Sequence, residues 1–159
     1  MIAALKVLAD QNICKFAIKK MNTFKKEERL CSRKSLDLLF KNGSSFLLYP
    51  YRISYLFVSE AQRFPVQVVI NVAKKRYKRA VDRNLIKRRI REAYRLQKEQ
   101  ELYTLLPGNN PLLLLSVQFV GKKIYDFSFL EKKLSAAFKR LTADLEVKKP
   151  NTGKSDEGN

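Results

Sequence analysis

Basic residues are concentrated in one stretch of this sequence, and their type and spacing suit the binding of phosphate groups. Between Lys74 and Lys98 the chain carries twelve Lys and Arg residues but only two acidic ones, Asp82 and Glu92. An Arg guanidinium can bind phosphate through two parallel N–H groups and can also stack on bases. The whole chain has 33 basic and 15 acidic residues and a net charge of +18. This excess predicts a polyanionic partner, either nucleic acid or an anionic membrane surface.

The basic stretch also has the periodicity of a helix, which sorts its residues onto two faces at about 100° per residue. One face, expected to pack on a sheet, holds Ile86, Ile90, Ala93, Gln97 and, at its margin, Tyr94. A second stripe holds Asn84, Lys87, Arg88, Arg91, Arg95 and Lys98. Like charges four residues apart destabilise a helix. Bound phosphates therefore explain the stripe better than the alternative, a solvated helix face.

Aromatic residues offer a second possible contact with nucleic acid. The chain has seven Tyr and ten Phe, most of them expected in the core. Tyr51 and Tyr55 on an expected strand, with Phe40 on an expected helix, could instead line a groove in which single-stranded bases stack. The strand register leaves Ser54 and Tyr55 interchangeable as the residue that faces this groove.

The residue types argue against catalysis by side chains. The chain has no His, so neither a Ser-His-Asp nor a Cys-His arrangement is possible, and its two Cys are too few for a structural zinc site. Asp37, Asp82 and Asp126 are isolated carboxylates, and no glycine-rich phosphate loop is present. We expect no catalytic residue and no metal site in the protein.

Helices and strands alternate along the chain in a way that predicts an α+β fold. A first helix is expected over Ser32–Asn42, with Ser32 as its N-cap and Gly43 at positive φ after its end. Period-two alternation predicts strands over 51–58 and 66–73, with an earlier portion at Phe46–Tyr49. The basic helix then spans roughly 78–101, a buried strand 111–120, and a last helix opens with a capping box at Ser128–Glu131.

The two ends differ from this central part. Residues 1–21 are expected to be an extension or a misplaced start before Met21, or alternatively a docking amphipathic helix. Residues 22–147 form the expected domain, and the polar residues 148–159 a disordered tail. The longest apolar runs, such as Leu112–Leu115, are far too short to span a membrane. Two Cys fit a reducing cytoplasm, with both thiols free.

The sequence of the basic stretch resembles the signature of the bacterial ribonuclease P protein family. The matching pieces are Lys74-Lys75, Ala80-Val81, Arg83-Asn84, Lys87-Arg88 and Arg91-Glu92. The resemblance covers about residues 22–147 and includes Phe24–Leu30, Phe40–Gly43, Pro111–Gly121 and Ser128–Leu141. It departs from the family pattern at Val69 and at Tyr77–Arg79, where glycine is frequent, and at Leu36, where an aromatic residue is usual.

This resemblance implies a fold and an activity. The fold is an α-β-β-β-α-β-α sandwich of a four-stranded mixed sheet and three helices, a ribosomal-protein-like fold. Its crossover through the basic helix is left-handed, an exception to the usual rule. The activity is that of a ribonucleoprotein, one protein to one RNA, in which the RNA cuts the 5′ leader from precursor tRNA. The Mg²⁺ ions are held mainly by the RNA and none by the protein alone.

The resemblance also implies two sets of binding residues. The catalytic RNA is expected to contact Lys74, Lys75, Lys78, Arg79, Arg83, Asn84, Lys87, Arg88, Arg91 and Arg95. The leader is expected in a cleft between the first helix and the sheet, at Leu36, Phe40, Tyr51 and Tyr55. The alternatives are a general RNA-binding or ribosomal protein with no role in cleavage, a reader of duplex DNA, and a peripheral membrane protein.

Overall fold

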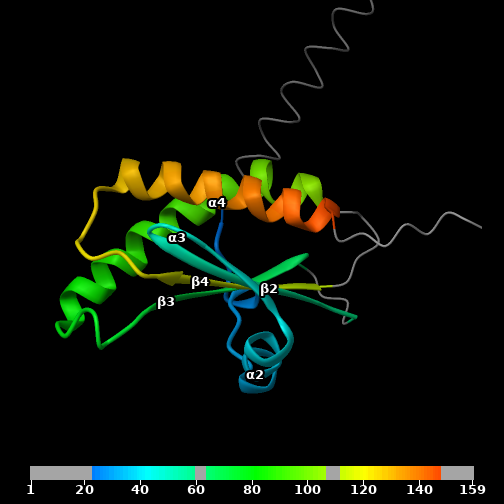
Figure 1. Ribbon diagram of the computed structural model, residues 1–159, viewed down its shortest axis with the longest axis horizontal. Coiled ribbons are helices and arrows are strands. Elements are labelled where there is room, and N and C mark those ends of the chain that lie inside the picture. Colours follow the sequence, from blue (N-terminus) through cyan, green and yellow to red (C-terminus); the bar gives the residue numbers. More distant parts are fainter. Residues whose placement is uncertain (1–22, 60–63, 107–111, 148–159) are drawn as a thin grey trace, which may run out of the picture.

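The computed structural model describes residues 23–59, 64–106 and 112–147 (Figure 1). The interpretations of residues 1–21 and of the tail from 148 concern segments outside these ranges. The described elements are η1 (Lys26–Glu28), α2 (Arg33–Asn42), β1 (Ser44–Leu48), β2 (Tyr51–Val58), β3 (Val66–Val72), α3 (Ala80–Glu101), η2 (Tyr103–Leu105), β4 (Leu112–Phe119) and α4 (Phe127–Val147). The α-β-β-β-α-β-α order is therefore confirmed.

The four strands form one mixed sheet in the order β1-β2-β4-β3. β2 pairs antiparallel with both β1 and β4, whereas β3 and β4 run parallel. Parallel neighbours need a long crossover connection, and the basic helix α3 provides it. The loop of residues 73–79 joins the end of β3 to the start of α3, at one end of the sheet.

Helices cover both faces of the sheet. α3 and α4 lie over one face, and the shorter α2 lies on the other (Figure 1). The main core, under α3 and α4, contains Tyr51, Ile53, Leu115, Val117 and Phe119. A smaller cluster under α2 contains Leu30, Leu39, Leu112 and Leu114. β4 is buried on both faces because it lies inside the sheet between two layers, which explains its continuous apolar run.

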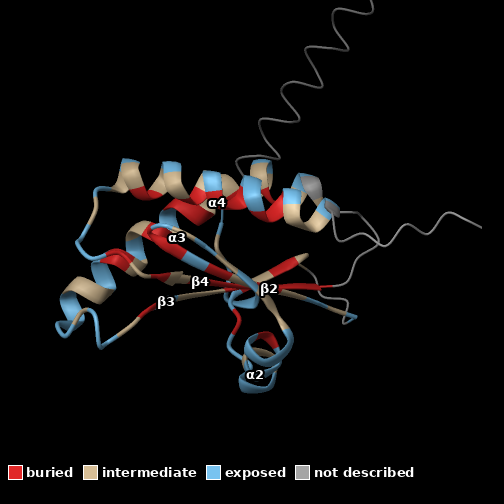
Figure 2. Cartoon of the chain, in the orientation of Figure 1, coloured by how far each residue is buried: buried red, intermediate tan, exposed pale blue. Residues whose placement is uncertain are grey.

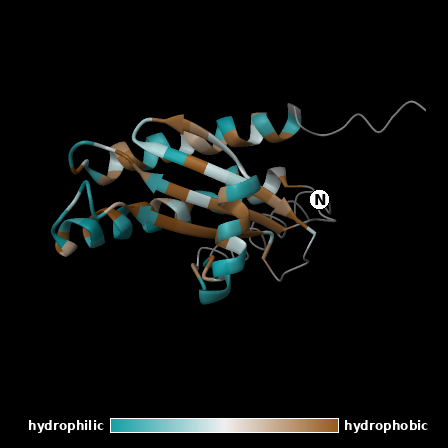
Figure 3. Cartoon of the chain, turned by 60° about the horizontal axis from the view of Figure 1, so that its bottom comes forward, coloured by the Kyte–Doolittle hydropathy of each residue, from teal (hydrophilic) through white to brown (hydrophobic). Residues whose placement is uncertain are grey.

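Figure 2 shows the buried residues gathered in the strands and on the inner sides of α3 and α4. Figure 3, in which the α2 side comes forward, shows long hydrophobic stretches along the strands, interrupted by polar ones. The sheet face beside α2 is only partly apolar, because Arg52, Ser54 and Ser116 lie on it together with Leu112 and Leu114.

Two local predictions concern the ends of α2. Ser32 caps α2 as expected, its Oγ accepting a hydrogen bond from the Ser35 N–H at 3.4 Å. Gly43 does not adopt positive φ but −74°, so the predicted reason for glycine was wrong. A Cβ at Gly43 would lie 2.2 Å from the Leu39 carbonyl oxygen, so close approach is what requires glycine here.

The predicted start of the last helix was also wrong. α4 begins at Phe127, and the Asp126 carbonyl accepts the hydrogen bond from Leu130 N–H at 3.2 Å. Ser128 therefore lies inside the first turn and cannot be the N-cap. The apolar face of this helix packs on the core: Leu130, Leu134, Ala137, Phe138 and Leu141 are fully buried, and Leu145 is partly buried against them.

Candidate RNA interface

The basic helix α3 is held on the sheet through the face that the sequence predicted. Ile86, Ile90, Ala93 and Tyr94 are 0% exposed and belong to the main core. Gln97, the fifth predicted member, is half-buried and donates to the Glu131 carbonyl at 2.9 Å. The opposite side of α3 is therefore turned away from the core.

The cations of this region lie in the loop before α3 and along the helix itself. Lys74, Lys75, Lys78 and Arg79 precede the helix and are exposed, as are Asn84 and Arg88 on it. Lys87 and Arg91 are half-buried, as are Arg83 and Arg95. We call one group of these residues the basic surface: Lys74, Lys75, Lys78, Arg79, Asn84, Lys87, Arg88 and Arg91. These side chains can bind several phosphates at once.

Arg83 has a structural contact besides any contact with RNA. Its guanidinium donates to the carbonyl oxygens of Tyr77 at 2.8 Å and Lys78 at 2.6 Å. These bonds hold the loop before α3 against the first turn of the helix. Replacing Arg83 would therefore disturb the loop as well as remove a charge.

Arg95 is paired with a carboxylate on the same helix. Its Nη2 lies 2.6 Å from Glu92 Oε1 and its Nε 3.0 Å from Oε2. The hydrogen bonds from Arg95 lower the pKa of Glu92. A phosphate at Arg95 would have to compete with this pair.

Lys98 was wrongly predicted as part of the exposed stripe. Its side chain is 1% exposed, and its Nζ donates to the carboxylate of Glu28, which is 0% exposed. The same Nζ donates to the Thr23 carbonyl at 2.5 Å, and the Tyr103 hydroxyl donates to Glu28 Oε2 at 3.1 Å. A helical wheel places Lys98 outside the face that packs on the sheet. It does not show that the segment around η1 covers this end of α3.

Two of the predicted cleft residues lie on the wrong face. Tyr51 and Tyr55 are 0% and 5% exposed and belong to the core under α3 and α4. The Tyr51 hydroxyl donates to the Leu130 carbonyl of α4 at 3.0 Å, and burial raises its pKa. Neither ring lies on the face beside α2. The predicted groove with these two rings is therefore wrong.

The face beside α2 carries the other residues of β2. Ser54, the alternative to Tyr55, lies on this face with Arg52, because the residues of a strand alternate between faces. Ser54 pairs with Ser116 and Arg52 with Gln118 across to β4. From α2 itself, Phe40 is 59% exposed, whereas Leu36 is half-buried in the cluster under the helix. Sequence reasoning missed Arg52, although its charge marked the polar side of the strand.

Within the ranges that the structure covers, no group of three or more Cys, Asp or Glu could hold a metal ion. None of the helices in those ranges is both long and apolar enough to cross a membrane. Cys31 is exposed with a free thiol, whereas Cys14 lies outside the described residues.

The fold and the basic surface define a small basic α+β protein with a surface suited to a polyanion. The ribonuclease P family model matches residues 24–142 of this sequence. The chain therefore belongs to the ribonuclease P protein family, and it is a subunit of that tRNA-processing endoribonuclease complex, whose RNA is its partner.

Individual relatives agree with this family. The ribonuclease P protein component of Porphyromonas gingivalis is 33% identical over 120 residues, which cover 76% of this chain and 87% of that protein. The component from Chlorobaculum tepidum is 43% identical over 84 residues, or 50% of this chain and 54% of that one. The Staphylococcus aureus ribonuclease P protein has the same fold, with a TM-score of 0.58 at 21% identity over 73% of this chain and 96% of that one.

Proposed function

We propose that this subunit binds the catalytic RNA through the basic surface and the 5′ leader of precursor tRNA on the sheet face beside α2. It thereby assists the Mg²⁺-dependent removal of the leader that gives the mature tRNA 5′ end. The observation that carries the proposal is the unpaired charge of the basic surface. In the part of the chain that the structure describes, the cations in ion pairs are Arg95 and Lys98, neither of which belongs to this surface.

The position of these cations supports binding to phosphates. Arg79 is the N-cap of α3, and no side chain caps the first backbone N–H groups. The positive end of the helix dipole therefore adds to the field of Lys75, Lys78 and Arg79, and Asp82 is the one acidic residue in the first turn. Phosphates at this point would neutralise side chains and backbone together.

The leader is proposed to lie on the face beside α2 because that face combines a stacking surface with a cation. The Phe40 ring is 59% exposed and can stack on an unpaired base. Arg52 is exposed on the neighbouring strand and can hold the RNA backbone. Ser54 and Leu36 complete this surface, in place of the buried Tyr51 and Tyr55.

Catalysis is proposed to belong to the RNA, with the Mg²⁺ ions held mainly there. The absence of His from the sequence and the isolated carboxylates support this division of roles. We propose one protein per RNA, acting in the cytoplasm, where the exposed Cys31 thiol would stay reduced.

The test is cleavage of precursor tRNA by the cognate catalytic RNA at low Mg²⁺. We expect wild-type protein to restore correct 5′ cleavage. Lys75→Ala/Arg88→Ala, which removes two exposed charges of the basic surface, should restore it poorly at limiting protein. The matched control is Lys132→Ala/Lys139→Ala, which removes two exposed charges from α4. Wild-type protein that binds RNA but leaves cleavage unchanged would favour the alternative, a general RNA-binding protein.

A further inference from the structure

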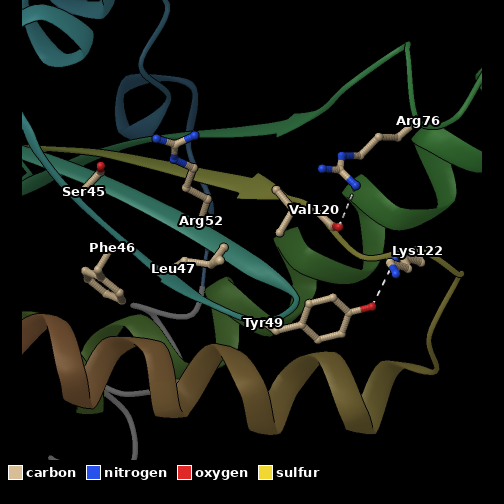
Figure 4. Close-up of a pocket in the computed structure, with 8 residues that line it drawn as sticks. All are labelled: Ser45, Phe46, Leu47, Tyr49, Arg52, Arg76, Val120 and Lys122. Carbon is tan, nitrogen blue, oxygen red and sulfur yellow. Dashed lines mark hydrogen bonds between the residues drawn. The ribbon is translucent and has the colours of Figure 1, made fainter.

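A pocket of about 540 Å³ lies at the end of the sheet, where three segments far apart in the sequence meet (Figure 4). They are the β1–β2 corner, the residues after β4, and the loop before α3. The lining residues are Ser45, Phe46, Leu47, Tyr49, Arg52, Arg76, Val120 and Lys122. We call it the corner pocket. Its volume is in the range of sites that hold small ligands.

The lining of the corner pocket favours an anion. Arg52, Arg76 and Lys122 are exposed cations, and none of the lining residues is acidic. The Arg76 guanidinium donates through Nη1 to the Val120 carbonyl at 3.1 Å. A guanidinium has five N–H donors, so this bond fixes Arg76 while leaving donors for a phosphate.

The corner pocket also has an apolar wall. The side chains of Leu47 and Tyr49 are 61% and 43% exposed. The Tyr49 hydroxyl accepts from the Lys122 N–H at 3.2 Å and is hydrogen-bonded to the Tyr125 hydroxyl at 2.6 Å. The ring is therefore positioned before any ligand arrives, which lowers the entropy cost of stacking a base on it.

Hydrogen bonds from the loop before α3 and from α3 itself hold the segment that follows β4 at the corner pocket. The Tyr77 hydroxyl donates to the Gly121 carbonyl at 3.0 Å, and Arg89 donates to the Tyr125 carbonyl at 2.5 Å. A Cβ on Gly121 would lie 2.4 Å from the Phe119 ring, so glycine permits this close approach. The pocket is thus held between the sheet and the start of α3.

We propose that the corner pocket binds one nucleotide of the 5′ leader, with its phosphate on Arg52, Arg76 and Lys122 and its base against Tyr49 and Leu47. This inference rests on the proposed function. The leader is favoured over the catalytic RNA because Leu47 and Arg52 are register partners on the sheet face that carries α2. A leader that leaves the tRNA beside the basic surface and then runs along the sheet face that carries α2 would pass the corner pocket.

The experiment measures precursor binding by the enzyme assembled with its catalytic RNA. The precursor is made uncleavable at the scissile phosphate, and single leader nucleotides are replaced in turn by abasic ones. Mature tRNA, which has no leader, is the reference ligand. The protein variants are Tyr49→Ala, Tyr49→Phe and Lys122→Ala, with Lys139→Ala on α4 as the matched charge control.

We expect Tyr49→Ala to weaken precursor binding by about 5- to 150-fold, the range for losing one base–aromatic stack. Mature tRNA should bind as before. In the wild type one abasic position should cost a similar factor, and Tyr49→Ala should abolish the cost at that position alone. Tyr49→Phe, which keeps the ring, should retain most of the affinity, and Lys122→Ala should weaken precursor binding selectively.

Three results would overturn the inference: unchanged precursor binding by both Tyr49→Ala and Lys122→Ala, equal weakening for precursor and mature tRNA, or no coupling to any leader position. Weaker assembly with the catalytic RNA alone would instead place an RNA nucleotide of that partner in the pocket. The proposed function fails separately, if the wild-type protein neither favours precursor over mature tRNA nor stimulates cleavage.

Discussion

Replacing Lys98 distinguishes a buried ion pair from an RNA contact. Lys98→Met keeps the length of the side chain but leaves the Glu28 carboxylate 0% exposed without its cation. The remaining partners of Glu28 are the Tyr103 hydroxyl and the Lys25 N–H, at 3.1 and 3.2 Å. Breaking a buried pair by removing one partner costs about 3–5 kcal/mol. This is a large part of the roughly 5–15 kcal/mol that stabilises a domain.

The assay is urea unfolding followed by circular dichroism. With a slope of about 2 kcal/mol per molar urea, the midpoint should fall by about 2 M. The control Lys132→Met changes an exposed residue of α4 and should stay within about 0.5 kcal/mol of wild type. Lys98→Met/Glu28→Leu removes both charges and should be more stable than Lys98→Met, because no buried carboxylate is left unpaired.

RNA binding supplies the second half of this test. Because the Lys98 Nζ is buried, folded Lys98→Met should show the same dependence of RNA affinity on salt as the wild type. A Lys98→Met variant of wild-type stability whose log–log salt slope is shallower by about 0.7–0.9, the contribution of one phosphate contact, would contradict a buried Lys98–Glu28 pair. That result would indicate that the Lys98 side chain is exposed and contacts RNA.

Substitutions at three further positions test the fold and the proposed leader surface. Gly43→Ala should destabilise the protein by about 1–3 kcal/mol in urea unfolding, because its Cβ would meet the Leu39 carbonyl; wild-type stability would contradict this. Ser32→Ala should cost about 1 kcal/mol in the same assay through loss of the α2 cap, whereas Ser32→Asp should retain stability. Phe40→Ala should weaken binding of precursor tRNA about 5- to 150-fold and leave mature tRNA unaffected, and equal effects on both would exclude a stacking role.

Much of the fold could be predicted because the signals are local. The 3.6-residue periodicity of α3 identified Ile86, Ile90 and Ala93 as its buried face, and period-two alternation located β2 and β3. The Ser32 cap and the apolar run of β4 are likewise properties of short segments. The structure contains these features because the packing of the helices on the sheet favours the same local conformations.

The errors in the predicted site arose where packing between distant segments decides. Alternation along β2 showed that Tyr51 and Tyr55 share one face, but both faces of this sheet are covered by helices. Which face of β2 packs against α2 depends on how the helices are arranged over the sheet. The alternation within the strand does not determine it. The same holds for Lys98, whose partner Glu28 lies 70 residues away in the sequence.

The polar residues of the strands were a usable signal. Arg52 and Ser54 mark one side of β2 as the more polar, and the structure places both on the face beside α2. The corner pocket had no such signal, since Tyr49, Arg76 and Lys122 come from three separate segments. Only the folded chain brings them together.

The most direct test of the central claim is the salt dependence of binding to the catalytic RNA. If the basic surface neutralises about six phosphates, log K should fall against log salt with a slope of about −4 to −5. Lys75→Ala/Arg88→Ala should make that slope shallower by about 1.4–1.8, whereas Lys132→Ala/Lys139→Ala should leave it unchanged. A nearly flat slope for the wild type, or the same slope for both double variants, would contradict RNA binding through the basic surface.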